Sequence, residues 1–146
     1  MQVRSLLGFD FGLTNIGVAV GQTVTKTASA LPTLKARDGI PCWNQVAALI
    51  NDWQPDAVVV GIPFNMDSSE SEMSLRARKF GNRIYGRFNL PFYEVDERLS
   101  SFEAKEWAKK LGHHGNYRSK PVDSMAAQLI LESWLNDNAN ILLLCP

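Results

Sequence analysis

Residues 57–62 form an uninterrupted apolar run, Ala-Val-Val-Val-Gly-Ile, bounded by Pro55-Asp56 and Pro63. A short β-branched run without polar alternation is typical of a central strand that is covered on both faces. Sheets that contain such strands carry helices on both sides. The run therefore predicts an α/β fold.

The other elements follow from apolar periodicity and from turn residues along the chain. We expect strands over 5–11, 16–20, 27–34, 57–62 and 91–96, and helices over 43–53, 73–87, 101–111 and 121–136. Pro32 has no backbone N–H to donate, so we expect the third strand to lie near the edge of the sheet. The order βββαβαβαα predicts a mixed five-stranded sheet flanked by helices. Its first, fourth and fifth strands would run parallel, with their carboxyl ends at one edge.

Composition limits the class of protein. The chain has 146 residues, of which 45% are hydrophobic and 21% are charged, as expected for one soluble globular domain. No signal peptide is visible, and no stretch approaches the roughly 20 apolar residues of a membrane span. Cys42 and Cys145 are far apart and read as free thiols. We expect a cytoplasmic protein with no membrane partner.

The formal net charge is zero, but the charges are unevenly distributed. Residues 76–120 contain eleven Lys or Arg and five Asp or Glu, which gives +6, and the rest of the chain carries −6. No acid occurs between Met73 and Leu90. A basic segment of this kind favours a nucleic-acid partner.

Acidic residues stand where the expected elements meet loops. Asp10 closes the first strand, the pair Asp96-Glu97 closes the fifth, and Asp123 lies in the first turn of the last helix. Ligands and catalytic groups gather at the carboxyl edge of such sheets. Carboxylates that converge there would repel one another unless a divalent metal neutralises them. A carboxylate cluster with bound magnesium is suited to cutting a phosphodiester bond.

Each acid also has an ordinary structural interpretation. Asp10 is a common turn residue, and Arg98 is available to pair with either acid of the 96–97 pair. Asp123 is favourable in a first helical turn through the helix dipole alone. Neighbouring residues on a strand face opposite ways, so one acid of the pair points inward. We favour Glu97 as the ligand and keep Asp96 as its rival.

The expected helix over 73–87 carries a stripe of cations at spacings of three and four residues. This stripe is suited to contacts with a phosphate backbone, although a solvated helix face is the common meaning of such charges. A second basic segment leads toward Asp123 and includes Arg118 and Lys120. The stripe consists of Arg76, Lys79, Arg83 and Arg87.

With these residues placed, the chain resembles the bacterial YqgF (RuvX-like) family, a branch of the RNase H-like nuclease superfamily. The resemblance extends over nearly all of residues 6–135. Its motifs are residues 9–12 (Phe-Asp-Phe-Gly), 16–21, 60–67, 76–80, 96–100 (Asp-Glu-Arg-Leu-Ser) and 122–124 (Val-Asp-Ser).

The resemblance implies an RNase H-like nuclease domain over residues 1–138, followed by a short apolar tail, 139–146. It implies a cytoplasmic endonuclease that uses two Mg²⁺ or Mn²⁺ ions and matures the 5′ end of pre-16S ribosomal RNA. Resolution of Holliday junctions is the alternative role. The implied catalytic and metal-binding residues are Asp10, Glu97 (or Asp96) and Asp123, and a loop with Asn65 and Asp67 would reach the substrate or the metals.

Several alternatives stay open from the sequence. The substrate is structured or single-stranded RNA, in a ribosome precursor, or a DNA junction, and the protein is a monomer or a homodimer. Residues 10–14 (Asp-Phe-Gly-Leu-Thr) also resemble the phosphate loop of actin-like kinases, but one unrepeated domain lacks room for that fold. The alternative outside enzymes is a nucleic-acid-binding module without catalysis.

Overall fold

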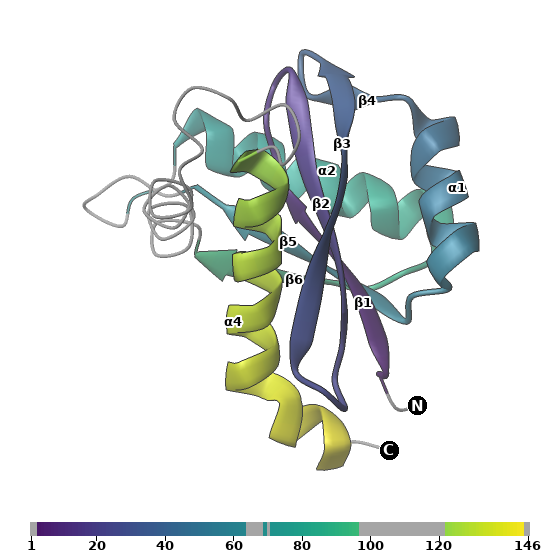
Figure 1. The fold of residues 1–146 in the computed structure, drawn as a ribbon. Coiled ribbons are helices and arrows are strands. Elements are labelled where there is room, and N and C mark those ends of the chain that lie inside the picture. Colours follow the sequence, from purple (N-terminus) through teal and green to yellow (C-terminus); the bar gives the residue numbers. More distant parts are fainter. Residues whose placement is uncertain (1–2, 64–68, 70, 97–121, 145–146) are drawn as a thin grey trace.

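The computed structural model describes residues 3–63, 69, 71–96 and 122–144, with backbone alone for 122–123 and 137–144 (Figure 1). Its strands are β1 (Ser5–Asp10), β2 (Asn15–Gln22), β3 (Thr27–Arg37), β4 (Ile40–Pro41), β5 (Ala57–Ile62) and β6 (Phe92–Asp96). Its helices are α1 (Trp43–Trp53), α2 (Glu72–Phe88) and α4 (Val122–Leu144).

The strands form one mixed sheet in the order β4-β3-β2-β1-β5-β6. β1 pairs antiparallel with β2 and parallel with β5, and β5 pairs parallel with β6. The expected α/β fold with parallel first, fourth and fifth strands is therefore confirmed. The carboxyl ends of β1, β5 and β6 lie at the same edge.

The described sheet has six strands instead of the expected five, because a two-residue strand follows β3. Arg37 pairs with Ile40 across a turn in which Asp38 has φ 51° and Gly39 has φ 79°. Positive φ at both central residues is typical of a tight two-residue hairpin turn, for which Asp-Gly is a preferred sequence. The Asp-Gly pair is therefore a sequence signal for this hairpin, which the expected five strands did not include.

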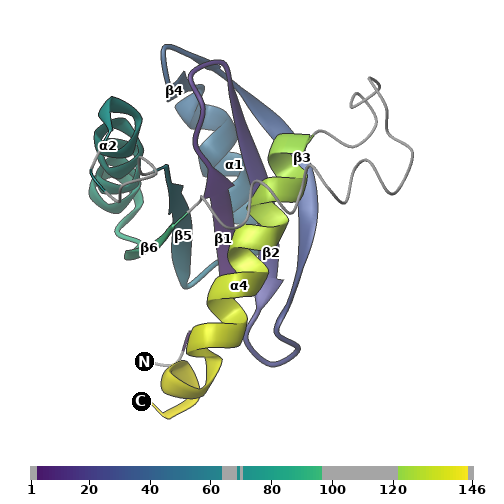
Figure 2. The same ribbon diagram turned by 90° about the vertical axis from the view of Figure 1, so that its left-hand side faces the viewer.

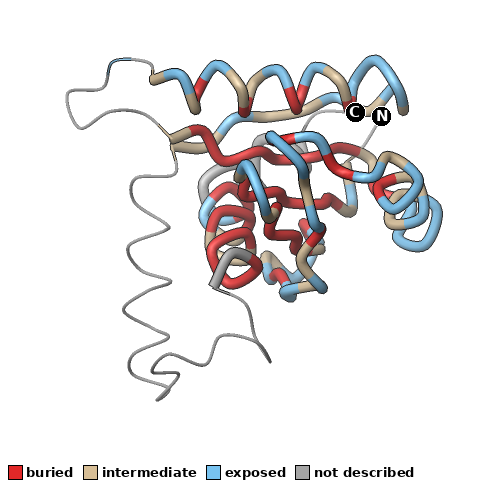
Figure 3. The backbone as a smooth tube through the Cα atoms, turned by 90° about the horizontal axis from the view of Figure 1, so that it is seen from above, coloured by how far each residue is buried: buried red, intermediate tan, exposed pale blue. Residues whose placement is uncertain are grey.

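Helices cover both faces of the sheet (Figure 2). Side chains of α1 and α2, among them Val46, Phe80 and Ile84, pack on one face. Residues of α4, including Ile130 and Leu131, pack on the other. All six residues of β5 are buried, as its apolar run predicted, and buried residues concentrate in the central strands (Figure 3).

Small residues let α4 approach the sheet closely. A Cβ at Gly8 would lie 3.0 Å from Leu131 Cβ, and one at Gly21 would lie 2.9 Å from Leu131 Cδ2. One turn before Leu131, Gln128 Nε2 donates a hydrogen bond to the Ala28 carbonyl of β3 at 3.0 Å. The helix is thus fixed to β1 and β2 by packing and to β3 by a hydrogen bond.

The helices match the expected bounds closely except at the C-terminal end of α4. α1 occupies residues 43–53 as expected, and α2 is longer by one residue at each end than the expected 73–87. The expected end of the last helix near Asn136 was wrong, because α4 continues to Leu144 and takes in much of the expected tail. The expected helix over 101–111 lies outside the described residues.

Candidate active site

Asp10 is the last residue of β1 and lies on the face of the sheet covered by α4. The assignment of faces follows from its neighbours, since Phe9 packs edge-on against Phe80 of α2 and Gly8 lies against Leu131 of α4. Strand residues alternate between faces, so Asp10 shares the α4 face with Gly8. Its side chain is 7% exposed, which is unusual for a carboxylate.

Glycines flank Asp10 on both neighbouring strands. Its Cα partner in β2 is Gly17, and its Cα partner in β5 is Gly61. Glycine has no side chain, so neither position projects atoms beside the Asp10 carboxylate. The Asp10 carboxylate thus lies at the end of β1 with no side chain on the paired residue of either neighbouring strand.

Ser124 anchors the first turn of α4 close to Asp10. Its Oγ accepts a hydrogen bond from the Val18 backbone N–H at 3.3 Å and lies 3.0 Å from Thr33 Oγ1. Val18 directly follows Gly17, the Cα partner of Asp10. Ser124 itself is 1% exposed. The helix therefore begins beside the end of β1.

The irregular pairing of β2 with β3 explains the bond to Ser124. The register of the two strands shifts between Ile16 and Val18. Ile16 pairs with Leu34, whereas Val18, two residues later, pairs with Leu31, which is three residues away on β3. Such a bulge leaves backbone groups outside the regular ladder. A buried backbone N–H needs an acceptor, and Ser124 supplies one to Val18.

Asp123 directly precedes Ser124, so its backbone belongs to the same anchored turn (Figure 1). The structure thus brings two of the three expected acidic positions, 10 and 123, to one end of the α4 face. The Asp123 side chain is outside the described atoms.

Asp96 belongs to the opposite face of the sheet. In β6, Tyr93 stacks on Trp134 of α4, whereas Glu94 forms an ion pair with Arg78 of α2. Val95 packs against the buried residues between α4 and the sheet, on the same face as Tyr93. By the same alternation Asp96 lies on the α2 face, away from the face that carries Asp10.

Five of the expected site residues are not among those described. Within the described residues, no group of three or more His, Cys, Asp or Glu side chains forms a metal site. The one described carboxylate on the α4 face at this edge, that of Asp10, offers the oxygen ligand that Mg²⁺ and Mn²⁺ prefer. The expected residues outside the described ranges are Glu97, Asn65, Asp67, Arg118 and Lys120.

The four cations of the α2 stripe have different surroundings. Arg76 Nη1 lies 2.8 Å from Asp38 Oδ1, and this hydrogen bond, with the charges of Asp38 and Glu72, raises the pKa of Arg76. The guanidinium of Arg87 lies 4.3 Å from the ring centroid of Trp43. Lys79 and Arg83 have no acidic partner among the described residues. The stripe is therefore not one uniform charged surface.

No helix in the described part of the chain is long and apolar enough to span a membrane.

The fold is RNase H-like and is shared with solved resolvases. RuvC of T. thermophilus, solved in complex with a Holliday junction substrate, superimposes with a TM-score of 0.60 at 19% identity, covering 94% of this chain and 96% of RuvC. The fowlpox virus resolvase, solved with Holliday junction DNA, gives a TM-score of 0.53 at 13% identity, covering 91% and 97%. At these identities the likeness concerns the fold alone.

Sequence similarity identifies the family within that class. The model of the RuvX family, described as Holliday junction resolvase, matches residues 4–137. Relatives named "Putative pre-16S rRNA nuclease" include one from Pseudomonas fluorescens, 57% identical over 143 residues, with 97% of this chain and 99% of the relative covered. Another, from Saccharophagus degradans, is 57% identical over 134 residues, covering 92% and 94%.

The chain belongs to the RuvX family, as its motifs indicated. This is a family of nucleases, which hydrolyse phosphodiester bonds.

Proposed function

We propose that this protein is a divalent-metal-dependent endonuclease that processes the 5′ end of pre-16S ribosomal RNA. The observation that carries the proposal is the nearly buried Asp10 carboxylate at the carboxyl end of β1, between two glycines and beside the anchored start of α4. The names of relatives at 57% identity support RNA as the substrate.

The proposed metal ligands are Asp10, Asp123 and Glu97. Asp10 and the first turn of α4 share one face, and Asp96 belongs to the other. Asp96 therefore faces away from the other two proposed ligands, which leaves Glu97 as the acid of the pair proposed to join them. This argument supports Glu97 over Asp96 as the third ligand.

Bound Mg²⁺ or Mn²⁺, two ions in this proposal, would supply a Lewis acid and a water activated for attack on phosphorus. The chain's own part is to hold and expose the carboxylates. β1 fixes Asp10 in a rigid central strand, Gly17 and Gly61 leave room for the phosphate, and Ser124 sets the position of Asp123. Cations of α2 would hold the backbone of the substrate without reading its sequence.

The test is cleavage of a 5′-extended 16S precursor RNA by the purified protein with Mg²⁺ or Mn²⁺. The Asp10→Asn and Asp123→Asn variants serve as controls, because the amide keeps the shape of the side chain and removes its charge. We expect metal-dependent cleavage by the wild type and none by either variant. Equal cleavage by the Asp10→Asn variant would refute the proposed site.

Resolution of Holliday junctions is the second candidate, favoured by the fold shared with RuvC and the fowlpox virus resolvase. A resolvase cuts two strands symmetrically and needs a two-fold dimer. A four-way DNA junction in the same assay separates the roles, since cleavage of the junction alone would assign the protein to resolution. Binding of both nucleic acids without cleavage would indicate a module that has lost catalysis.

We also propose that the protein works in the cytoplasm, where ribosome precursors are processed, as one nuclease domain. All described helices pack on a single sheet, which supports one domain. Light scattering of the purified protein would distinguish a monomer from a homodimer.

A further inference from the structure

A cavity of about 190 Å³ lies between α2 and the β3–β4 hairpin. Its apolar floor includes Phe11 and Phe80, whose ring centroids are 5.7 Å apart, and both rings are buried. Ile40, which is 47% exposed, forms an apolar rim. The cations around it are Arg76, Lys79 and Arg83.

One of these cations is neutralised from within the protein. Arg76 contacts Asp38 at 2.8 Å and Glu72 at 3.5 Å. It thereby ties α2 to the hairpin that closes the cavity. Because two carboxylates compensate its charge, Arg76 lines the cavity as a structural residue and is not counted as a ligand for an anion.

Lys79 and Arg83 form no ion pair with any described residue and stand one helical turn apart. At this spacing their side chains are neighbours on the helix surface. An Arg fork and a Lys ammonium together match the oxygens of a phosphate group. A cavity with two such cations above an apolar floor is suited to an anion that also carries an apolar part, as a nucleotide does.

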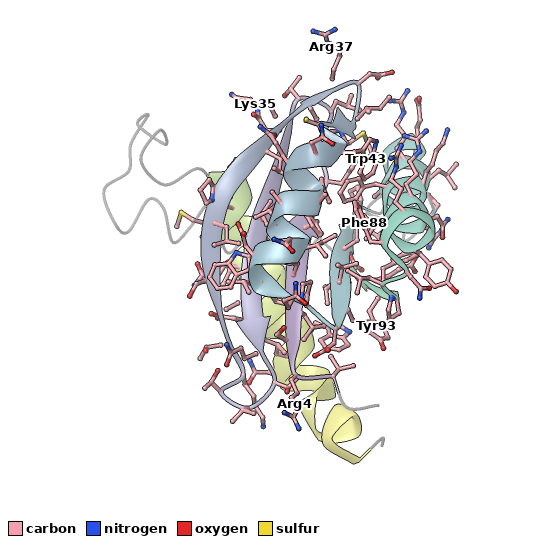
Figure 4. The ribbon with its side chains drawn as sticks, turned by 90° about the vertical axis from the view of Figure 1, so that its right-hand side faces the viewer. Arg4, Lys35, Arg37, Trp43, Phe88 and Tyr93 are labelled. Carbon is pink, nitrogen blue, oxygen red and sulfur yellow. The ribbon has the colours of Figure 1, made fainter. Side chains whose placement is uncertain are left out.

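The cavity and Asp10 lie on opposite faces of the sheet but at the same edge. Phe11, in the cavity floor, directly follows Asp10 and packs against α2. A nucleic-acid strand that crosses this edge would reach Asp10 with one phosphate and the cavity with another. Figure 4 shows Trp43 beside α2 near this end of the molecule and Arg4 at the opposite end.

We propose that this cavity binds a phosphate of the nucleic-acid substrate, in a nucleotide that flanks the bond to be cut. Lys79 and Arg83 hold the phosphate, and Ile40 contacts the attached sugar. The inference rests on the proposed nuclease function and adds a second contact point, separate from the metal site.

The first test measures binding of a single-stranded RNA oligonucleotide in EDTA by fluorescence anisotropy, over a range of salt concentrations. The Lys79→Gln/Arg83→Gln variant should bind about tenfold more weakly, with a salt slope lower by about 0.7, because one phosphate contact is lost. Arg4→Gln removes an exposed cation at the opposite end of the sheet and should change neither quantity. Equal binding by the double variant and the wild type would overturn the proposal.

A second pair of variants tests the cavity without removing any cation. Ile40→Glu places a carboxylate at the rim, where it should weaken RNA binding several-fold. Val24→Glu adds the same charge at a position that is 77% exposed, in the turn between β2 and β3. If both variants weaken binding equally, the effect is one of net charge and the cavity is not the site.

Cleavage kinetics separate this inference from the proposed function. For a long RNA, the Lys79→Gln/Arg83→Gln variant should raise KM and leave kcat unchanged, because the contact is made equally in the ground and transition states. For an RNA too short to cross the sheet edge, it should change neither constant. A fall in kcat with unchanged KM would refute the cavity's role, whereas cleavage by Asp10→Asn would refute the function and leave the binding result standing.

Discussion

Replacing Ser124 with alanine would test how the fold positions the first turn of α4, which carries the proposed metal ligand Asp123. Its Oγ is the acceptor for the Val18 N–H and the partner of Thr33 Oγ1. Val18 is fully buried, so Ser124→Ala leaves a buried donor without an acceptor, at a cost of about 1–3 kcal/mol. Apolar contacts of α4 with the sheet remain, and we expect the protein to stay folded.

The effect on catalysis should exceed the effect on stability. Asp123, a proposed metal ligand, directly precedes Ser124, and small displacements of a catalytic group lower the rate by large factors. We therefore expect Ser124→Ala to lower kcat on RNA and to weaken Mn²⁺ binding. The RNA affinity measured in EDTA should be unchanged, because the α2 cations are untouched.

The measurements are urea unfolding, Mn²⁺ titration calorimetry and cleavage kinetics. Thr33→Val removes one of the two partners of Ser124 and should give a smaller loss of stability. Ser29→Ala, at an exposed position on β3, is the matched control. If Ser124→Ala matches Ser29→Ala in both stability and kcat, the anchoring argument is refuted.

Further predictions concern glycine packing in α2, the space beside Asp10 and the requirement for a divalent metal. Gly81→Ala places a Cβ 2.6 Å from the Phe92 ring and should destabilise the folded protein by about 1–3 kcal/mol. A Cβ at Gly86 meets nothing within 4 Å, so Gly86→Ala should stabilise the protein by about 0.5–1 kcal/mol. Urea unfolding measures both changes. Gly61→Ala adds a methyl beside Asp10 and should lower kcat on the order of tenfold or more, with circular dichroism unchanged. EDTA should abolish cleavage and retain RNA binding in anisotropy, and Mn²⁺ should restore cleavage.

Local signals predicted most of the fold. The apolar run at 57–62 and the helix at 43–53 have the expected bounds, because each is flanked by strong turn residues. The end of α4 could not be read, since asparagines at 136, 138 and 140 are weak helix formers and yet lie within the helix.

The site was predicted only in part, because its contacts join distant segments. Asp10 was placed correctly at the strand end. Ser124 is recognisable in the sequence as a small residue, but its role depends on the β2–β3 bulge some 100 residues earlier. The stripe on α2 was read as four equivalent cations, and no pattern in the sequence shows that Asp38 pairs with Arg76.

The central claim is that catalysis depends on the carboxylate on the α4 face and not on its neighbour across the sheet. The most direct test compares kcat of Asp10→Asn and Asp96→Asn on the same precursor RNA with Mn²⁺. We predict a loss on the order of a hundredfold or more for Asp10→Asn and near wild-type activity for Asp96→Asn. An active Asp10→Asn variant together with an inactive Asp96→Asn variant would contradict the account.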